Sequence, residues 1–271
     1  MSLITHIKAA AAQKGKPYPA DKIRYIGVYS LPPAIDPMDG DSFPTHLASL
    51  NMSDNPSSKA PLRIGVVLFP GFQALDAFGP LDCINVLSRT ESITLALLST
   101  TLDPVSTQAP DIPTTTGQSI LPTHTFATAP PLDVLLVPGG RGSRGSSPPV
   151  TEAIAFIQKT YSSLKYLITV CTGSGLVARA GVLDGRRATS NKMVWREMSA
   201  LRPEVEWVAR ARWVVDGNIW TSSGVSAGID VTLAWIGEVF GKDKAKGIAD
   251  WIEYSRHEDP DVDPFAELYG L

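Results

Sequence analysis

The sequence contains little cysteine, with two residues in 271, and this scarcity excludes one class of protein. Cys83 and Cys171 cannot provide the disulfide framework that stabilises small secreted domains. Free thiols are kept in reducing compartments, so we expect the protein to be cytoplasmic. The N-terminus has one early basic residue and only a short apolar stretch, which is a poor match to a signal peptide.

Long apolar runs and basic clusters are missing as well. No apolar run approaches the roughly 20 residues that a membrane-spanning helix needs, and a net charge of −3 gives no basic field for nucleic acid. The four histidines lack the paired spacing of a metal site, and neither a Rossmann fingerprint nor a P-loop ending occurs. We therefore expect a small-molecule substrate and no membrane, nucleic acid, metal or cofactor.

The first 60 residues differ from the rest in composition and in hydrophobic patterning. Proline, serine and aspartate punctuate them, and the pattern allows only a helix near Ser2–Gln13 and a strand at Arg24–Tyr29. We interpret residues 1–60 as an N-terminal extension or arm, with a disordered tail as the alternative. Residues 61–271 are predicted to form one α/β domain.

Short apolar runs alternate with helical spacing through this domain. Such runs fit strands buried on both faces, and strands that alternate with helices indicate a parallel sheet between two helical layers. We therefore predict a three-layer α/β/α sandwich of the flavodoxin-like type, with an antiparallel ribbon turning at Asp216-Gly217-Asn218 on one sheet edge. The predicted strands are 63–69, 93–99, 114–120, 133–138 and 165–170, and the predicted helices are 74–87, 150–162, 173–180, 193–201 and 227–240.

Cys171 stands where an apolar strand ends and a small, glycine-rich helix begins, in the stretch TVCTGSGLVARAG. A nucleophile on such a strand-to-helix turn is exposed above the sheet. The positive end of the helix should lower the pKa of the thiol, and the backbone N–H of Thr172 could bind a developing anion. The alternative is a buried apolar filler, which is our interpretation of Cys83 in the middle of a predicted helix.

Two further segments lie after buried strands and so at the same edge of the sheet. Asp76 follows the first strand in the run LFPGFQALDAFGPLD, and its apolar neighbours predict a raised pKa and a role in proton transfer. We expect Gly79-Pro80 to kink or restart the helix there. The glycines of VPGG follow a second strand, where the amide of Gly140 could bind a negative charge.

The motifs FPGFQALDAFGP, DVLLVPGG, VCTGSG, GVLDGRRATS and TSSGVSAGIDVTLAWI, in this order, resemble the PfpI-like superfamily, which has the class I glutamine amidotransferase fold. The resemblance covers about residues 63–265 and is greatest to the isocyanide hydratase branch. It implies Cys171 as nucleophile, Asp76 as its acidic partner, the amides of Gly140 and Thr172 as oxyanion donors, and a homodimer. Asn191 takes the place of a histidine found in many members.

The resemblance thus implies a lyase that hydrates an isocyanide to an N-formamide through a thioimidate on Cys171. Without an imidazole, a Cys–His peptidase or histidine-dependent glyoxalase reaction is less well supported. Another reaction on the same Cys–Asp pair remains an alternative, such as glyoxal hydration, amide hydrolysis or a biosynthetic step. A second alternative is a non-catalytic redox or ligand sensor. Because no helix-turn-helix pattern follows residue 265, we do not expect the architecture of the related transcriptional regulators.

Overall fold

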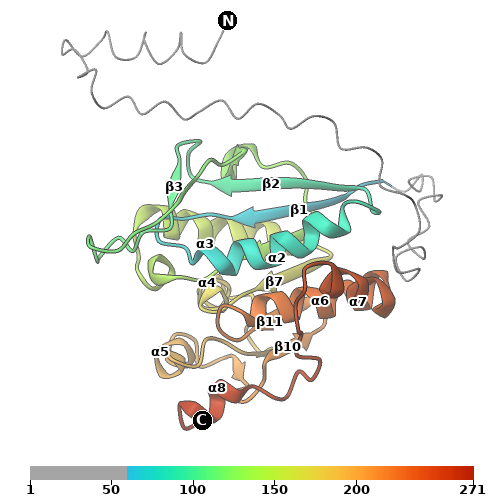
Figure 1. Ribbon diagram of the computed structural model, residues 1–271. Coiled ribbons are helices and arrows are strands. Elements are labelled where there is room, and N and C mark those ends of the chain that lie inside the picture. Colours follow the sequence, from blue (N-terminus) through green and yellow to red (C-terminus); the bar gives the residue numbers. More distant parts are fainter. Residues whose placement is uncertain (1–59) are drawn as a thin grey trace, which may run out of the picture. The chain divides into compact units, whose positions relative to one another are not determined.

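A seven-stranded sheet forms the centre of the computed structural model, which describes residues 60–271 (Figure 1). Every strand pair in this sheet is parallel except β10 with β11, so the antiparallel ribbon at the sheet edge is confirmed. In spatial order the strands are β10 (Trp213–Asp216), β11 (Ile219–Ser222), β7 (Tyr166–Thr169), β6 (Val134–Val137), β1 (Leu62–Val67), β2 (Ile93–Ser99) and β5 (His124–Thr125).

Helices cover both faces of the sheet, which confirms the predicted α/β/α sandwich. The helices α2 (Ala74–Leu87), α6 (Ala227–Phe240) and α7 (Lys242–Trp251) contact one another, and α3 (Pro148–Thr160) contacts α4 (Gly173–Arg179) on the other face (Figure 1). Because both faces are covered, residues 64–67 of the central strand β1 are all buried. Every residue of β6 is buried, as its run of Val and Leu predicts.

Shorter elements connect these layers. The predicted strand at 114–120 is wrong in extent, because only Ser119–Ile120 pairs, as β4 with β3 (Val105–Ser106). The other short elements are β8 (Arg187–Ala188), β9 (Glu206–Trp207), α5 (Trp195–Ala200), α8 (Pro264–Leu268) and the 3₁₀ turns Phe126–Thr128, Arg141–Arg144 and Tyr161–Ser163. The helix and strand predicted before residue 60 lie outside the described residues, and the domain boundary near residue 60 stays a prediction.

The helix α2 runs unbroken through Pro80, so the predicted restart is wrong. Proline removes one backbone hydrogen bond, here the one that the carbonyl of Asp76 would otherwise accept. Pro80 is itself buried, and its packing offsets that loss. Asp76 is consequently held in a continuous helix whose first turn lies at the carboxyl end of β1.

Candidate active site

Four chain segments converge at the carboxyl edge of the parallel sheet, where ligands bind in open α/β folds. β1 leads to Asp76, β6 to Gly139, β7 to Cys171 and β11 to Val225. Strands adjacent in space but distant in sequence thus bring these residues to one place. The predicted grouping of Cys171 with Asp76 and the VPGG glycines is present in the structure.

Cys171 adopts the left-handed backbone conformation, with φ of 60°. This conformation strains a residue with a side chain, and it persists only where surrounding bonds enforce it. The N–H of Cys171 donates to the carbonyl of Ser223 at 3.0 Å. Its carbonyl accepts from the hydroxyls of Ser174 and Ser190, both at 3.1 Å. These three bonds fix the sharp turn between β7 and α4, as a nucleophile elbow requires.

Asp76 is fully buried, and its two carboxyl oxygens have different surroundings. Oδ2 accepts from the N–H of Gly139 at 2.9 Å, whereas Oδ1 has no hydrogen-bond partner among residues 60–271. Burial raises the pKa of Asp76 to about 7, against the smaller opposing effects of the Gly139 N–H and the nearby Cys171 thiol. A carboxyl group with this pKa can both accept and return a proton near neutral pH.

The thiol of Cys171 is nearly buried, with 5% of the residue exposed. Burial and then the negative charge of Asp76 raise its pKa to about 12. The backbone N–H of Val225, the side chain of Asn191 and the backbone N–H of Thr172 lower it by smaller amounts. The predicted lowering of the thiol pKa is therefore wrong, because desolvation outweighs the donors at the elbow.

The thiol and the carboxyl group form a coupled acid pair. Both groups are buried, where water does not screen their charges, so a thiolate and a carboxylate side by side would repel each other strongly. The pair therefore carries at most one negative charge near neutral pH. When the thiol proton moves to the Asp76 carboxylate, the negative charge that opposes ionisation of Cys171 disappears. The proton can consequently pass from sulfur to carboxylate when an electrophile is present.

Asn191 completes the surroundings of the sulfur. Its Nδ2 donates to the Cys171 Sγ at 3.1 Å, and its Oδ1 accepts from the N–H of Val194 at 3.3 Å. An amide side chain is a hydrogen-bond donor but cannot act as a base in the way that imidazole can. In this site Asn191 can stabilise a thiolate, while Asp76 is the group placed to take the proton.

The Gly140 amide already has an acceptor in this structure. It donates to the Thr172 Oγ1 at 2.9 Å, and this hydroxyl also lies 2.8 Å from the Ser143 Oγ. Of the two predicted anion donors, only the backbone N–H of Thr172 is directed at the sulfur. An anion could bind at the Gly140 amide only if the Thr172 hydroxyl rotated away.

The approach of the β6 loop to the elbow depends on Gly139 having no side chain. A Cβ there would lie 2.4 Å from the Thr172 Oγ1 and 2.5 Å from the Thr172 backbone nitrogen. Real side chains do not tolerate such contacts, so glycine is required for the Gly139 N–H to reach Asp76.

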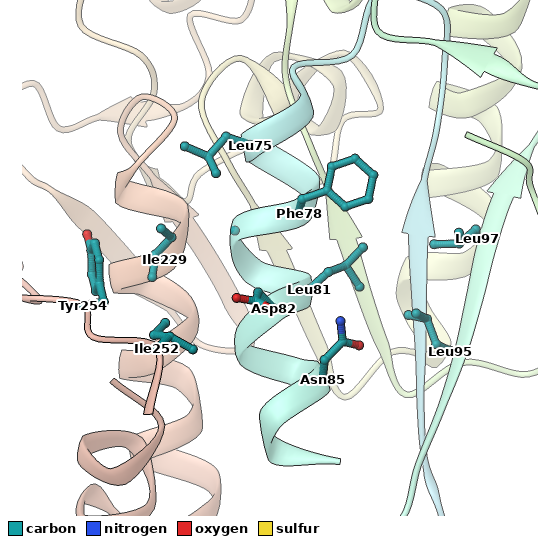
Figure 2. Close-up of a pocket in the computed structure, with 11 residues that line it drawn as sticks. Leu75, Phe78, Leu81, Asp82, Asn85, Leu95, Leu97, Ile229, Ile252 and Tyr254 are labelled. Carbon is teal, nitrogen blue, oxygen red and sulfur yellow. The ribbon is translucent and has the colours of Figure 1, made fainter. Parts of the chain in front are cut away.

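The helix α2 presents a second face away from the thiol. A groove of about 600 Å³ lies between this face and neighbouring elements. Its lining includes Leu75 and Phe78 of α2, Leu97 of β2 and Ile229 of α6 (Figure 2). Asp76 is not among these lining residues. This groove is therefore lined by residues of α2 other than the one that contacts the Cys171 site.

Residues 60–271 contain neither a metal-binding cluster nor a membrane-spanning helix. No three histidine, cysteine or acidic side chains cluster as a metal site would require. Within the same range, none of the helices has the length and apolar character needed to cross a membrane.

Sequence reasoning did not identify Val225 or Ser190 as site residues. Val225 has φ of 43°, which is unusual for a β-branched residue and directs its N–H at the sulfur. The pattern TSSGVSAG does not predict that conformation. Ser190 precedes Asn191, and its hydroxyl bonds the elbow only because the loop after β8 folds back onto β7.

Comparison with known proteins identifies relatives of this chain. The DJ-1/PfpI family model matches residues 62–238. Isonitrile hydratase of Pseudomonas putida is 36% identical over 194 residues, which cover 72% of this chain and 79% of that protein. The HTH-type transcriptional regulator GbdR of Pseudomonas aeruginosa is 32% identical over 206 residues, covering 74% of this chain but 53% of the regulator.

Solved structures agree with this assignment. A ThiJ/PfpI family protein from Pseudomonas syringae superposes with a TM-score of 0.61 and 28% identity, covering 77% of this chain and 85% of that one. Sequence and structure point to the same group, and the chain belongs to the DJ-1/PfpI family.

Proposed function

We propose that the protein is a lyase of the isocyanide hydratase type. The observation that carries this proposal is a thiol at a strained elbow beside a buried carboxyl group with one unpartnered oxygen. The similarity to isonitrile hydratase over most of both chains favours the same substrate class. The donor from Asn191, where a Cys–His enzyme would have a base, agrees with a reaction that uses only one proton carrier.

The first step forms a bond between the Cys171 sulfur and the terminal carbon of R–N≡C. Asp76 takes the thiol proton and returns it to that carbon, which gives a thioimidate with all atoms of the isocyanide retained. The Asn191 amide and the Thr172 N–H stabilise the sulfur while it carries charge. The pKa of about 7 for Asp76 suits both directions of proton transfer.

The second step is hydrolysis. Water adds to the carbon of the thioimidate, the carbon–sulfur bond breaks, and the nitrogen is protonated, so that an N-formamide leaves and the thiol is restored. Asp76 is again the proton carrier between the water and the leaving sulfur, and the second proton of the water goes to the nitrogen, so no further donor is needed. The Thr172 N–H, and the Gly140 amide after rotation of the Thr172 hydroxyl, would bind the oxygen while it is negatively charged.

A panel of alkyl and aryl isocyanides tests this function, with formamide measured by mass spectrometry. We expect formamide from at least one member, and after rapid acid quenching an adduct on the Cys171 peptide heavier by the mass of the isocyanide. Formamide production without dependence on Cys171 would contradict the proposal, and so would a complete lack of turnover across the panel.

A sensor role is the second candidate, favoured by the similarity to the regulator GbdR. In that case Cys171 would be oxidised reversibly or would bind a ligand without turnover. Peptide mass spectrometry after peroxide treatment distinguishes the two, because a reversible Cys171 oxidation combined with no turnover of any substrate would favour the sensor.

We also propose a cytoplasmic homodimer. The family resemblance implies a dimer, and both Cys83 and Cys171 are free thiols, as a reducing compartment allows. Light scattering coupled to size-exclusion chromatography tests the dimer, which would have twice the chain mass of 29.0 kDa. A mass that stays at 29.0 kDa at micromolar concentration would overturn it.

A further inference from the structure

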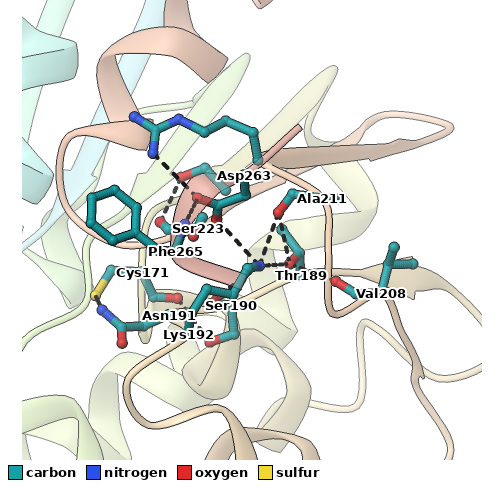
Figure 3. A network of polar contacts seen from close by, with 12 residues as sticks. Cys171, Thr189, Ser190, Asn191, Lys192, Val208, Ala211, Ser223, Asp263 and Phe265 are labelled. Carbon is teal, nitrogen blue, oxygen red and sulfur yellow. Dashed lines mark hydrogen bonds and ion pairs between the residues drawn. The ribbon is translucent and has the colours of Figure 1, made fainter. Parts of the chain in front are cut away.

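The loop that carries Asn191 to the thiol connects β8 to α5 and wraps around the elbow. On one side of this loop, Ser190 bonds the Cys171 carbonyl and Asn191 bonds the Cys171 sulfur. The next side chain, Lys192, turns the opposite way into the protein interior (Figure 3). Asn191 and Lys192 are thus adjacent residues whose side chains leave the loop in different directions.

The ammonium group of Lys192 is buried, with 1% of its side chain exposed. It donates to the Thr189 Oγ1 at 2.6 Å, to the Ser190 carbonyl at 3.1 Å and to the Ala211 carbonyl at 2.9 Å (Figure 3). An ammonium group has three N–H donors, so these bonds use all of them. Two of the acceptors lie in the loop itself, which is thus closed around the charge.

The opposite charge comes from a distant part of the chain. The Asp263 Oδ2 lies 3.7 Å from the Lys192 Nζ, and the Asp263 side chain is fully buried. Arg212 lies 3.7 Å from the other Asp263 oxygen and pairs with Asp230 of α6 at 2.8 Å. Two cations and two carboxylates are therefore buried together, and the sum of their charges is zero.

We propose that Lys192 and Asp263 are positioning residues, whose buried ion pair fixes the loop 189–192 and so holds the Asn191 amide against the Cys171 sulfur. The inference rests on the proposed role of Cys171 as the reactive thiol, but not on isocyanide as its substrate. It makes the segment before α8 part of the reactive site, although Asp263 touches neither the sulfur nor Asp76.

The charges explain why this contact differs from ordinary packing. A buried ammonium group without a counter-charge has to lose its proton or move towards water. Either change breaks some of its bonds to Thr189 and Ser190, and the neighbouring Asn191 would move with them. Loss of the Asn191 donor raises the pKa of the thiol, since that hydrogen bond now lowers it. Asp76 is the charged group facing the thiol, and it is the same in every variant considered below.

The test measures alkylation of Cys171 by iodoacetamide from pH 6 to 10, read by peptide mass spectrometry. We expect Lys192→Met and Asp263→Asn each to lower the rate at least tenfold at pH 7 and to shift the pH profile upward. At pH 7 the Lys192 ammonium group of the unsubstituted protein is charged, because burial lowers its pKa only to about 8. Lys165→Met is the control, because Lys165 is 65% exposed and pairs with Asp133 instead. Unchanged rates in both Lys192→Met and Asp263→Asn would overturn the proposal.

A double substitution separates positioning from general loosening of the structure. In an Asn191→Ala background, Lys192→Met should lower the Cys171 rate less than twofold further, because the amide it positions is gone. Cys83, which is fully buried in α2, should stay unreactive throughout. A tenfold loss that persists in the Asn191→Ala background, or exposure of Cys83 together with the Cys171 effect, would contradict positioning.

Hydrogen exchange of the unsubstituted protein tests the same proposal if the variants do not fold or if Cys171 does not react with iodoacetamide. Peptides covering residues 189–192 and 260–265 should open with one common free energy, since one ion pair joins them. Separate openings would overturn the proposal. These readouts do not require turnover, so a protein that behaves as expected here but hydrates no isocyanide would contradict the proposed function alone.

Discussion

The Asn191 Nδ2 lies 3.1 Å from the Cys171 Sγ, and this bond gives a buried thiol a polar partner that cannot take its proton. The loop after β8 and the elbow after β7 meet through it, although the two residues are 20 positions apart. In the proposed mechanism the proton is therefore carried by Asp76, on a third element.

Asn191→Ala should slow formamide production without preventing folding. A hydrogen bond to a charged group contributes about 1.5–3 kcal/mol, so kcat/KM should fall about 10–160-fold. Asn191→Asp should reduce kcat/KM further, because a second carboxylate near the sulfur disfavours the thiolate. Steady-state kinetics of the two variants at pH 8 measure both effects. Equal activity in Asn191→Asp and the unsubstituted protein would contradict this role.

The pH profile of the reaction should report Asp76. At low pH the thiol and the carboxyl group are both protonated, so no base is present, and kcat/KM should rise as pH increases through about 7. The decline from loss of the second proton should fall beyond the usual assay range, since the Cys171 pKa is about 12. Asp76→Asn should have a low rate with no rise near pH 7. A rise that persists in this variant would assign the titration to another group.

The stability of the protein should depend on pH through the same carboxyl group. Burial raises the Asp76 pKa from 3.8 to about 7, so the unfolded chain releases this proton at lower pH than the folded one. Asp76 therefore costs stability as pH rises from about 4 to 7. Between pH 5 and pH 8 the unsubstituted protein should therefore lose about 2–3 kcal/mol more unfolding free energy than Asp76→Asn does. Urea unfolding of both proteins at the two pH values measures this loss. An equal change in the two proteins would contradict the burial argument.

Gly139→Ala should disrupt the site through a steric clash. The added Cβ would lie 2.4 Å from the Thr172 Oγ1, so the β6 loop or the elbow has to shift. We expect a loss of about 2–3 kcal/mol in unfolding free energy and loss of most formamide production. Gly247→Ala is a matched control, because it lies in α7, where the added Cβ would meet nothing within 4 Å beyond its chain neighbours and the backbone of its own helix. It should gain up to about 1 kcal/mol. Similar thermal melting shifts in the two variants would contradict the clash.

The sequence predicted the helices of this fold better than its site electrostatics. The bounds of α2 and α6 agree with the predicted ranges 74–87 and 227–240, because apolar spacing and flanking glycine and serine define them locally. Between β2 and β6 the strands have two residues each, which is too few for a recognisable pattern.

The position of Cys171 was predictable, since an apolar strand followed by small residues indicates an elbow. The direction of its pKa shift was not predictable. Burial of the thiol depends on the loop after β8, on Val225 before α6 and on Asp76 of α2, all of them distant in sequence. The ion pair of Lys192 with Asp263 spans 71 positions and leaves no local pattern either.

Formamide production by Cys171→Ala, measured beside the unsubstituted protein with one accepted isocyanide, tests the central claim most directly. If the sulfur forms the bond to the isocyanide carbon, removing it should lower the rate at least about 10⁴-fold, as expected for loss of a nucleophile. A Cys171→Ala protein that keeps its rate within tenfold would show that the sulfur is not the reacting atom.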